Sequence, residues 1–458
     1  MRARHPPCPA VWLAGRGKSP PDVFPRLKTS GFHGRYASAI ASLRSSRLFI
    51  HSLLAILVAS AATVRGADDD GGRPIDTGAN RAAAPVEGQA DRRAERIEVE
   101  TDGVRRVVEG IVVVEALDGG LLVERADERL ELLEPGTIRS RAAVAEPSVE
   151  TPREVGRRIL GELPAGFDLV VTRHYVICFD TSRAYAQWCG GLFERLYDVF
   201  VNYWRQAGLE PSAPPRPLVV VIFASRQRYE AFAARDLGAA ADRVVGYYNL
   251  LTNRVTTFDL TGSAALARPA GRSAARAGLE ILASPEAAGL VSTLVHEATH
   301  QMAFNAGLHR RLAPVPLWVS EGVATFFEAP DLASDRGWKG IGNVNGPRLE
   351  TFLATHRAGD LEAIVLGDEP FRRPDQAVDA YARAWALTSY LAQTRKAAFV
   401  AYLRAIARKE PLADDSPEQR LQDFTDAFGT TPAGLEEPMM RHLARLRPPA
   451  GRAPAAGR

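Results

Sequence analysis

Short runs in which apolar and polar residues alternate fill residues 96–141. Segments such as IEVET and RLELLE repeat with a period of two, which is typical of a strand with one buried face. Asp118, Gly119 and Gly120 separate two of these runs, and Asp-Gly is a hairpin signal. We therefore predict a small all-β module over residues 96–141. Because it contains no histidine or cysteine, it shows no obvious chemistry of its own.

Residues 146–152 form a predicted linker, and after it strand and helix patterns alternate. Ser225 is a candidate N-cap for one of the helices. Beyond about residue 285 the pattern is helical throughout. This order indicates an α+β fold, in which a mixed sheet is followed by a mainly helical C-terminal part. The segments before residue 285 are a strand with an internal turn (167–180), a long amphipathic helix (183–207), a buried strand (217–223) and a hairpin or paired edge strand (246–260).

Residues 1–66 differ from the rest of the chain in charge and hydropathy. They carry ten Lys/Arg and one acid, and the apolar run Leu48–Ala62 follows Arg44 and Arg47. A run of this length, followed by small residues, is typical of an export signal and short for a membrane span. We therefore expect a leader and signal peptide over residues 1–66, and export to the periplasm, the cell surface or the medium. An uncleaved membrane anchor is the alternative; if the signal is cleaved, no stable membrane insertion is expected.

Composition and charge limit the classes of protein to which the chain can belong. Hydrophobic residues make up 46% and charged residues 24%, which is a globular composition. Residues 67–95 are polar and rich in Gly, Ala and Asp, so they predict a disordered linker, and residues 447–458 predict a disordered tail. Without residues 1–66 the chain has 57 − 10 = 47 basic and 54 − 1 = 53 acidic residues, a net charge of −6. This mildly acidic body gives no electrostatic reason to expect nucleic acid as a partner.

The cysteines leave one question open. Cys8 lies in the leader, whereas Cys178 and Cys189 are eleven residues apart. In an oxidising compartment these two could form a disulfide, and two small buried thiols are the equal alternative. Two cysteines are too few for a structural zinc site, so neither is a metal candidate.

The stretch LVSTLVHEATHQ, residues 290–301, carries the strongest chemical signal. His296 and His300 stand at positions i and i+4, so on a helix both imidazoles face one side and can reach one zinc ion. Glu297 lies between them, where it can accept a proton from a water molecule beside the metal. A buried helix with two hydrogen-bonded histidines and no metal is the alternative.

A third metal ligand is required, because a catalytic zinc has three protein ligands and one open position. The metzincin pattern would place glycine and histidine where this chain has Ala303 and Ala306, so that class is excluded. The gluzincin pattern has a glutamate on a following helix. Glu321, in PLWVSEGVATFFE, lies 21 residues after His300 and fits. A turn over residues 305–316 would place the two helices antiparallel, so that Glu321 faces the imidazoles.

Two further residues are weaker candidates. Glu328 lies two helical turns after Glu321 and could support the ligands, but we interpret it as a solvated or helix-pairing glutamate. His309 competes as a ligand. Because it adjoins Arg310 and Arg311, we interpret it as a surface residue.

The segment HEATH followed by WVSEGVATFFE resembles the HExxH…WLxEGxA signature of gluzincin peptidases, the peptidase MA clan that includes thermolysin and the aminopeptidase N group. More narrowly, residues 165–445 are similar to a family of secreted bacterial proteins of uncharacterised function in that clan, with GYYNLLTN, HEATHQ, WVSEG and YARAWAL in that order. The resemblance implies a gluzincin-like metallopeptidase domain of zincin-like fold over residues 150–446. It also implies one zinc ion per chain and a protein or peptide substrate.

The resemblance implies two more features of the site. In aminopeptidase-like gluzincins a tyrosine about sixty residues past the glutamate ligand stabilises the oxyanion, and Tyr381 stands in that place, with Tyr390 as a weaker substitute. A packed helix tyrosine is the alternative. An antiparallel strand before the zinc helix pairs with extended substrate, and residues 253–260 are the best candidate, unless they form a plain structural strand. The Gly-Ala-Met-Glu-Asn segment that binds a free amine in aminopeptidases is missing, so aminopeptidase specificity is not implied.

Together these patterns predict an exported zinc hydrolase, first of all a peptidase, with Glu297 as general base and Tyr381 as oxyanion donor. A catalytically silent zinc-binding or scaffold module on the cell envelope is one alternative. A metallohydrolase of non-peptide amides or esters is another, because the ligand set is the same for both chemistries. The sequence gives no indication of the oligomeric state.

Overall fold

The structure is a computed structural model that describes residues 94–145, 149–262, 288–329 and 344–446. All of them belong to one compact unit. The predicted leader over 1–66, most of the predicted linker over 67–95 and the predicted tail over 447–458 lie outside the described residues. No helix within the described ranges is long and apolar enough to cross a membrane.

The predicted all-β module is a five-stranded antiparallel sheet with strand order β4-β3-β2-β1-β5. The expected hairpin at Asp118–Gly120 joins β2 to β3, and the strands begin and end slightly outside the predicted bounds of 96–141. A small apolar cluster that includes Ile97, Val108 and Val123 holds the sheet together. Its elements are β1 (Ala94–Thr101), β2 (Val104–Glu115), β3 (Leu121–Arg125), β4 (Leu130–Leu133), the 3-10 helix η1 (Pro135–Thr137) and β5 (Ile138–Ala143).

A second sheet follows, with strand order β6-β7-β8-β10-β9. The pairs β7–β8 and β8–β10 are parallel, whereas β6–β7 and β9–β10 are antiparallel, so the sheet is mixed as predicted. Strands β7 and β8 are buried along their whole length, which explains their apolar sequences. The strands are β6 (Asp168–Val171), β7 (Tyr175–Phe179), β8 (Leu218–Phe223), β9 (Gly246–Asn249) and β10 (Arg254–Phe258).

The prediction that residues 253–260 form the substrate-binding edge is wrong. Strand β10 pairs through Val255 with Val220 of β8 on one side and with Tyr248 of β9 on the other, so both of its edges are occupied. The strand of this hairpin that lies at a sheet edge is β9. Both strands of this hairpin are buried and rich in β-branched or aromatic residues, so the sequence period could not reveal which one lies outside.

Helices α2 (Pro152–Glu162), α3 (Arg183–Gln206) and α4 (Arg226–Leu237) pack on this sheet, with the short turns η2 (Gly238–Ala240) and η3 (Leu260–Gly262) nearby. Helix α4 begins at the predicted cap, because the Ser225 side chain accepts from the amide of Arg228. Helix α2 was not predicted. The sequence does carry its signal: Thr151 and Glu154 form a capping box, and Pro152, assigned above to a linker, is the first helical residue.

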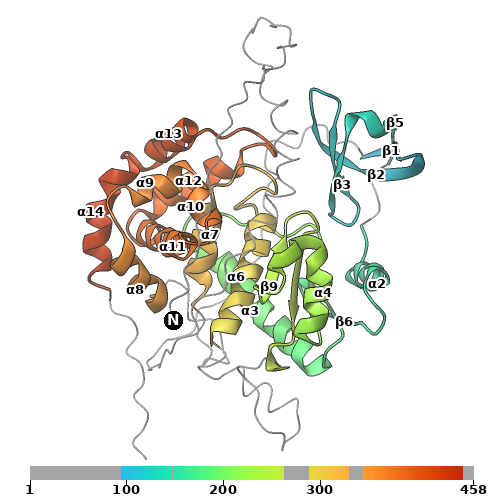
Figure 1. Cartoon of the computed structure of the whole chain (residues 1–458), viewed down its shortest axis with the longest axis horizontal. Coiled ribbons are helices and arrows are strands. Elements are labelled where there is room, and N and C mark those ends of the chain that lie inside the picture. The colour runs from blue at the N-terminus through green and yellow to red at the C-terminus, as the bar shows by residue number, and fades with distance from the viewer. Residues whose placement is uncertain (1–93, 146–148, 263–287, 330–343, 447–458) are drawn as a thin grey trace, which may run out of the picture. The chain divides into compact units, whose positions relative to one another are not determined.

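The rest of the described chain is helical, which completes the predicted α+β fold. Figure 1 shows α8 to α14 grouped together in orange and red. Helix α6 packs on β9, β10 and α3, while α7 packs on α6 and α11. The helices are α6 (Ala288–Asn305), α7 (Leu317–Phe327), α8 (Gly346–Thr355), α9 (Asp360–Leu366), α10 (Glu369–Arg372), α11 (Ala377–Thr394), α12 (Lys396–Ala407), α13 (Pro417–Phe428) and α14 (Pro432–Leu443).

Cys178 and Cys189 are both free and buried, so the thiol alternative holds and the disulfide does not form. Burial raises the pKa of the Cys178 thiol to about 12. It also raises the pKa of Cys189. Both side chains therefore act as small apolar residues of the core.

Candidate metal centre

Helix α6 carries three of the predicted site residues on buried positions. His296, Glu297 and His300 are each at most 7% exposed. The rings of the two histidines lie 4.7 Å apart between centroids, as expected for positions i and i+4. Thr299 between them donates its hydroxyl to the carbonyl of Val295 and so stays within the helix.

Glu321 of α7 joins the two histidines in one buried group, as predicted. Its Oε2 lies 3.1 Å from Nε2 of His296 and 3.4 Å from Nε2 of His300, and the two Nε2 atoms are 3.1 Å apart. A tetrahedral ion with bonds of about 2.0–2.1 Å holds its ligand atoms roughly 3.3 Å apart. The three side chains therefore fit a metal ion, and no other group of metal-ligating side chains in the described residues does so.

The charges of this group also suit a cation. Burial disfavours a charged His296, but hydrogen bonds with Glu321 and Glu328 outweigh this effect and raise the pKa of the ring to about 10. Burial acts to raise the pKa of Glu321, yet His300 and His296 hold it well below its usual range. The buried carboxylate is therefore ionised, and a positive charge, either a proton on His296 or a metal ion, must balance it.

Glu328 is not the solvated or helix-pairing residue that we predicted. Its Oε2 lies 3.2 Å from Nδ1 of His296, and its Oε1 accepts from Arg348 at 3.3 Å and from Asn345 at 3.4 Å. Although burial raises the pKa of Glu328, the guanidinium of Arg348 and the His296 ring lower it below its usual value. The carboxylate thus holds the ring nitrogen that faces away from the ligand group, and fixes which nitrogen points inward.

Glu297 lies against strand β9. Its Oε2 accepts from the backbone amide of Tyr248 at 2.7 Å. Burial raises the pKa of Glu297, against the lowering effects of His296, His300 and this amide. A buried carboxyl with a raised pKa is a better proton acceptor than an exposed one. Nothing in the sequence alone assigned Tyr248 a role, because a backbone contact leaves no mark on residue type.

Tyr381 reaches the group from helix α11. Its ring lies 6.3 Å from that of His296 between centroids and packs on Phe371 at 5.7 Å, while Arg348 stands over it at 5.5 Å. Burial, with Glu321 and Glu297 nearby, raises the pKa of Tyr381 well above its ordinary value, so the phenol keeps its proton. Tyr390, predicted as the weaker candidate for the same role, lies at the other end of α11, where its ring packs on His442 of α14.

Residues 290–413 match a family described as a protein of unknown function, DUF1570. The match begins in α6 and runs through α7 and α11, so it includes all three ligand candidates, Glu297 and Tyr381. A comparison with curated proteins gave no match. The family match therefore coincides with the site but brings no activity with it.

Gly322, directly after Glu321, allows α7 to lie against α11. A methyl group at this position would come within 2.1 Å of Oγ1 of Thr388 and 2.9 Å of the Ala384 carbonyl. At the start of α7, the amide of Leu317 donates to Asp368, which in turn pairs with Arg420. These contacts fix the position and depth of the helix that carries Glu321.

His309 is buried, so the surface interpretation is wrong. Only 2% of the residue is exposed, and its ring packs on Phe304 with its Nδ1 beside the carbonyl of Leu308. Burial lowers its pKa to about 4, so the ring is neutral. His309 does not belong to the ligand group. Its two arginine neighbours suggested exposure, but both make ion pairs with other segments, which leaves His309 free to turn inward.

Proposed function

We propose that this chain is an exported zinc-dependent peptidase of the gluzincin type, with His296, His300 and Glu321 as the metal ligands. The observation that carries the proposal is the convergence of these three buried side chains at the spacing of a tetrahedral ion, with Glu297 beside them. Two imidazoles and one carboxylate are a ligand set of catalytic zinc, which leaves a fourth position open.

The surroundings support a hydrolytic role for the group. A purely structural zinc site is closed by four protein ligands, whereas only three are present among the described residues. Glu297 is not part of the ligand group, yet it is buried next to it with a raised pKa. Burying a carboxyl is unfavourable and its pKa stays raised despite the nearby histidines, so its presence here favours a function in proton transfer over a structural one.

Zinc, when bound, would supply a Lewis acid that polarises a substrate carbonyl and makes a water molecule more acidic. Glu297, oriented by the amide of Tyr248, accepts the proton of the attacking water. Its carboxyl then donates that proton to the nitrogen as the carbon–nitrogen bond breaks. Tyr381, which keeps its phenolic proton, donates a hydrogen bond to the oxygen on which negative charge develops.

Strand β9 is the substrate-binding surface in this proposal, because it is the sheet edge beside Glu297. An extended peptide would add to the edge by backbone hydrogen bonds, which recognise conformation more than sequence. The strand reads Gly-Tyr-Tyr-Asn and has no carboxylate to hold a free amino terminus. Cleavage within a chain is therefore favoured over removal of the first residue.

The proposal is tested by metal analysis and peptide cleavage on the same preparations. The purified protein should contain about one zinc per chain, and Glu321→Ala should lose most of it. With zinc bound, the wild type should cleave members of a broad fluorogenic peptide library, and Glu297→Gln should retain the metal but not the cleavage. A folded, zinc-loaded wild type that cleaves no peptide, or a Glu297→Gln variant as fast as wild type, would overturn the proposal.

A further inference from the structure

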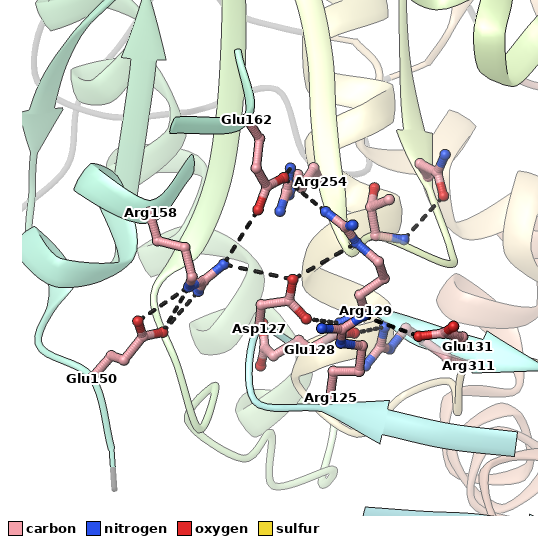
Figure 2. A network of polar contacts seen from close by, with 12 residues as sticks. Arg125, Asp127, Glu128, Arg129, Glu131, Glu150, Arg158, Glu162, Arg254 and Arg311 are labelled. Carbon is pink, nitrogen blue, oxygen red and sulfur yellow. Dashed lines mark hydrogen bonds and ion pairs between the residues drawn. The ribbon is translucent and has the colours of Figure 1, made fainter. Parts of the chain in front are cut away.

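The turn between β3 and β4 of the N-terminal sheet is inserted against the hairpin that forms the edge of the second sheet. Figure 2 shows Asp127 and Arg129 of this turn reaching Arg158 and Glu162 of α2, and Glu162 in turn pairing with Arg254 of β10. Glu128 is only 8% exposed although it is at the tip of a turn. The amide of Leu130 donates to the carbonyl of Leu251, so the backbones of the two segments are also joined.

Arg311, from the segment between α6 and α7, closes this junction. Its guanidinium donates to the carbonyl of Glu128 at 2.7 Å and to the carbonyl of Leu250 at 3.3 Å, and pairs with Glu124 at 2.7 Å. Burial raises the pKa of Glu128, while Arg311 and Asn253 lower it. Burying a carboxyl costs stability unless hydrogen bonds satisfy it, so the side chain that hydrogen-bonds to Glu128 is important.

Asn253 is that partner, and its side-chain amide uses all four of its hydrogen-bonding positions. Its Nδ2 donates to Oε2 of Glu128 at 3.0 Å and to Oδ1 of Asn305 at 2.8 Å. Its Oδ1 accepts from the phenol of Tyr248 at 2.7 Å and from Nδ2 of Asn305 at 2.8 Å. Because a carboxylate only accepts, Glu128 dictates that the NH2 of Asn253 faces the N-terminal sheet and that its oxygen faces Tyr248.

Tyr248 connects Asn253 to Glu297 of the candidate metal centre. Its phenol is held by Asn253, its ring stacks on Phe304 of α6 at 5.8 Å, and its backbone amide donates to Glu297. A continuous series of hydrogen-bonded and packed groups thus runs from Glu128 through Asn253 and Tyr248 to the carboxylate proposed as the general base.

We propose that Glu128 is a positioning residue: acting through Asn253 and Tyr248, it holds strand β9 in register with Glu297, so that the N-terminal sheet is a working part of the hydrolase. This inference rests on the activity proposed above. It assigns a role to a module whose own sequence has no chemical signature. Buried and fully satisfied polar networks of this kind specify one local arrangement, and loss of one member relaxes it.

The test uses the full chain, four single variants and the double variant Glu128→Ala/Tyr248→Phe. Glu128→Ala removes the acceptor, whereas Glu128→Gln keeps a carbonyl oxygen at the same position and should rescue. Tyr248→Phe removes only the phenol link and leaves the N-terminal sheet untouched, so it decides the matter even if Glu128→Ala folds poorly. Arg129→Ala is the matched control, because Arg129 is on the same turn but pairs with Glu162 of α2.

For cleavage of the best peptide, Glu128→Ala and Tyr248→Phe should each lower kcat about tenfold with zinc content unchanged. KM should stay within about twofold, which separates positioning of a reacting group from loss of substrate binding. The double variant should be no slower than the slower single variant, because both changes break one series. Arg129→Ala should match wild type. Equal losses in Glu128→Ala and Arg129→Ala, or additive losses in the double variant, would overturn the proposal.

A second readout decides the inference even if the protein cleaves no peptide, the result that would instead defeat the proposed function. Hydrogen exchange of the Tyr248 amide should be about tenfold faster in Glu128→Ala than in wild type, and unchanged in Arg129→Ala. Exchange at wild-type rate in Glu128→Ala would show that Glu128 does not hold β9.

Discussion

Nδ1 of His296 lies 3.2 Å from Oε2 of Glu328, while Nε2 of the same ring lies 3.1 Å from Oε2 of Glu321. One imidazole is therefore held between two carboxylates, that of Glu321 in α7 and that of Glu328, the residue that follows the helix. Glu328 takes the proton-bearing nitrogen and leaves the lone pair of the other for a metal ion.

Replacing Glu328 should weaken metal binding. In Glu328→Ala the ring of His296 loses its orientation and Arg348 loses its partner, so zinc affinity should fall by about 10- to 100-fold. Competition with a chromophoric chelator measures this. Glu350→Ala, which removes an exposed glutamate from neighbouring α8, should bind zinc like wild type. Unchanged affinity in Glu328→Ala would mean that Glu328 only neutralises Arg348.

Tyr381→Phe should separate catalysis from metal binding. Loss of one donor to a developing oxyanion lowers kcat by about 10²- to 10³-fold, and zinc content should not change, since Tyr381 is not a ligand. Steady-state cleavage of a fluorogenic peptide gives kcat. Tyr390→Phe on the same helix is the control, because Tyr390 contacts His442 rather than the metal centre. A fully active Tyr381→Phe variant would reduce this tyrosine to a packing residue.

Zinc binding should release a proton from His296. In the metal-free chain the raised pKa of His296, about 10, keeps the ring protonated at pH 7, and a ligand nitrogen must lose that proton. Zinc affinity should therefore rise with pH by about tenfold per unit below pH 10. Calorimetric titrations in two buffers of different ionisation enthalpy count the proton. Identical heats in both buffers would contradict this account.

Gly322→Ala should destabilise the fold. The added methyl group meets Thr388 and the backbone of α11, and overpacking of this kind costs about 1–3 kcal/mol. Urea unfolding measures the free energy. Gly161→Ala in α2 is the matched control, because a methyl group there meets no atom within 4 Å. Zinc content should fall in Gly322→Ala alone, since the shift of α7 moves Glu321.

His309 should make the fold sensitive to acid. Its pKa is lowered to about 4 from an ordinary value near 6.5. Its contribution to stability is therefore complete above pH 6.5 and is lost as the pH falls towards 4, a change of up to about 3 kcal/mol. The free energy of unfolding of His309→Phe should vary less over this window than that of wild type. His442→Phe, at a position on α14 outside the core, should follow the wild-type curve. Parallel curves for wild type and His309→Phe would exclude this source.

The group of candidate metal ligands could be predicted from the sequence because its residues are spaced by helix geometry. His296 and His300 are one turn apart, and Glu321 follows on the next helix, so residue type and spacing sufficed. The predictions for Glu328 and His309 were wrong because the partners of a polar side chain decide whether it turns inward. The partner of Glu328, Arg348, is distant in sequence. His309 packs on Phe304, but its neighbours Arg310 and Arg311 suggested an exposed position. Local period cannot report those partners.

The fold shows the same limit. Alternation and apolar runs predicted the two sheets and the helical C-terminal part, but not that β9 rather than β10 is the edge, since strand order is set by long-range pairing. The role of the N-terminal sheet was out of reach for a related reason. Glu128 is unremarkable within its own turn and becomes significant only through Asn253, far along the chain.

Helices α7 and α11 are so closely packed at Gly322 and Thr388 that they should move as one rigid body, which carries both Glu321 and Tyr381. His296, Glu297 and His300 belong to another body, because α6 packs on β9 and β10 and Gln301 donates to carbonyls of β8 and of the residue preceding β10. An ion bound by both His300 and Glu321 would join the two bodies. Removal of the ion by a chelator would then loosen the contact between the two bodies as well as abolish the proposed activity, so resistance to proteolysis would report whether the metal is bound.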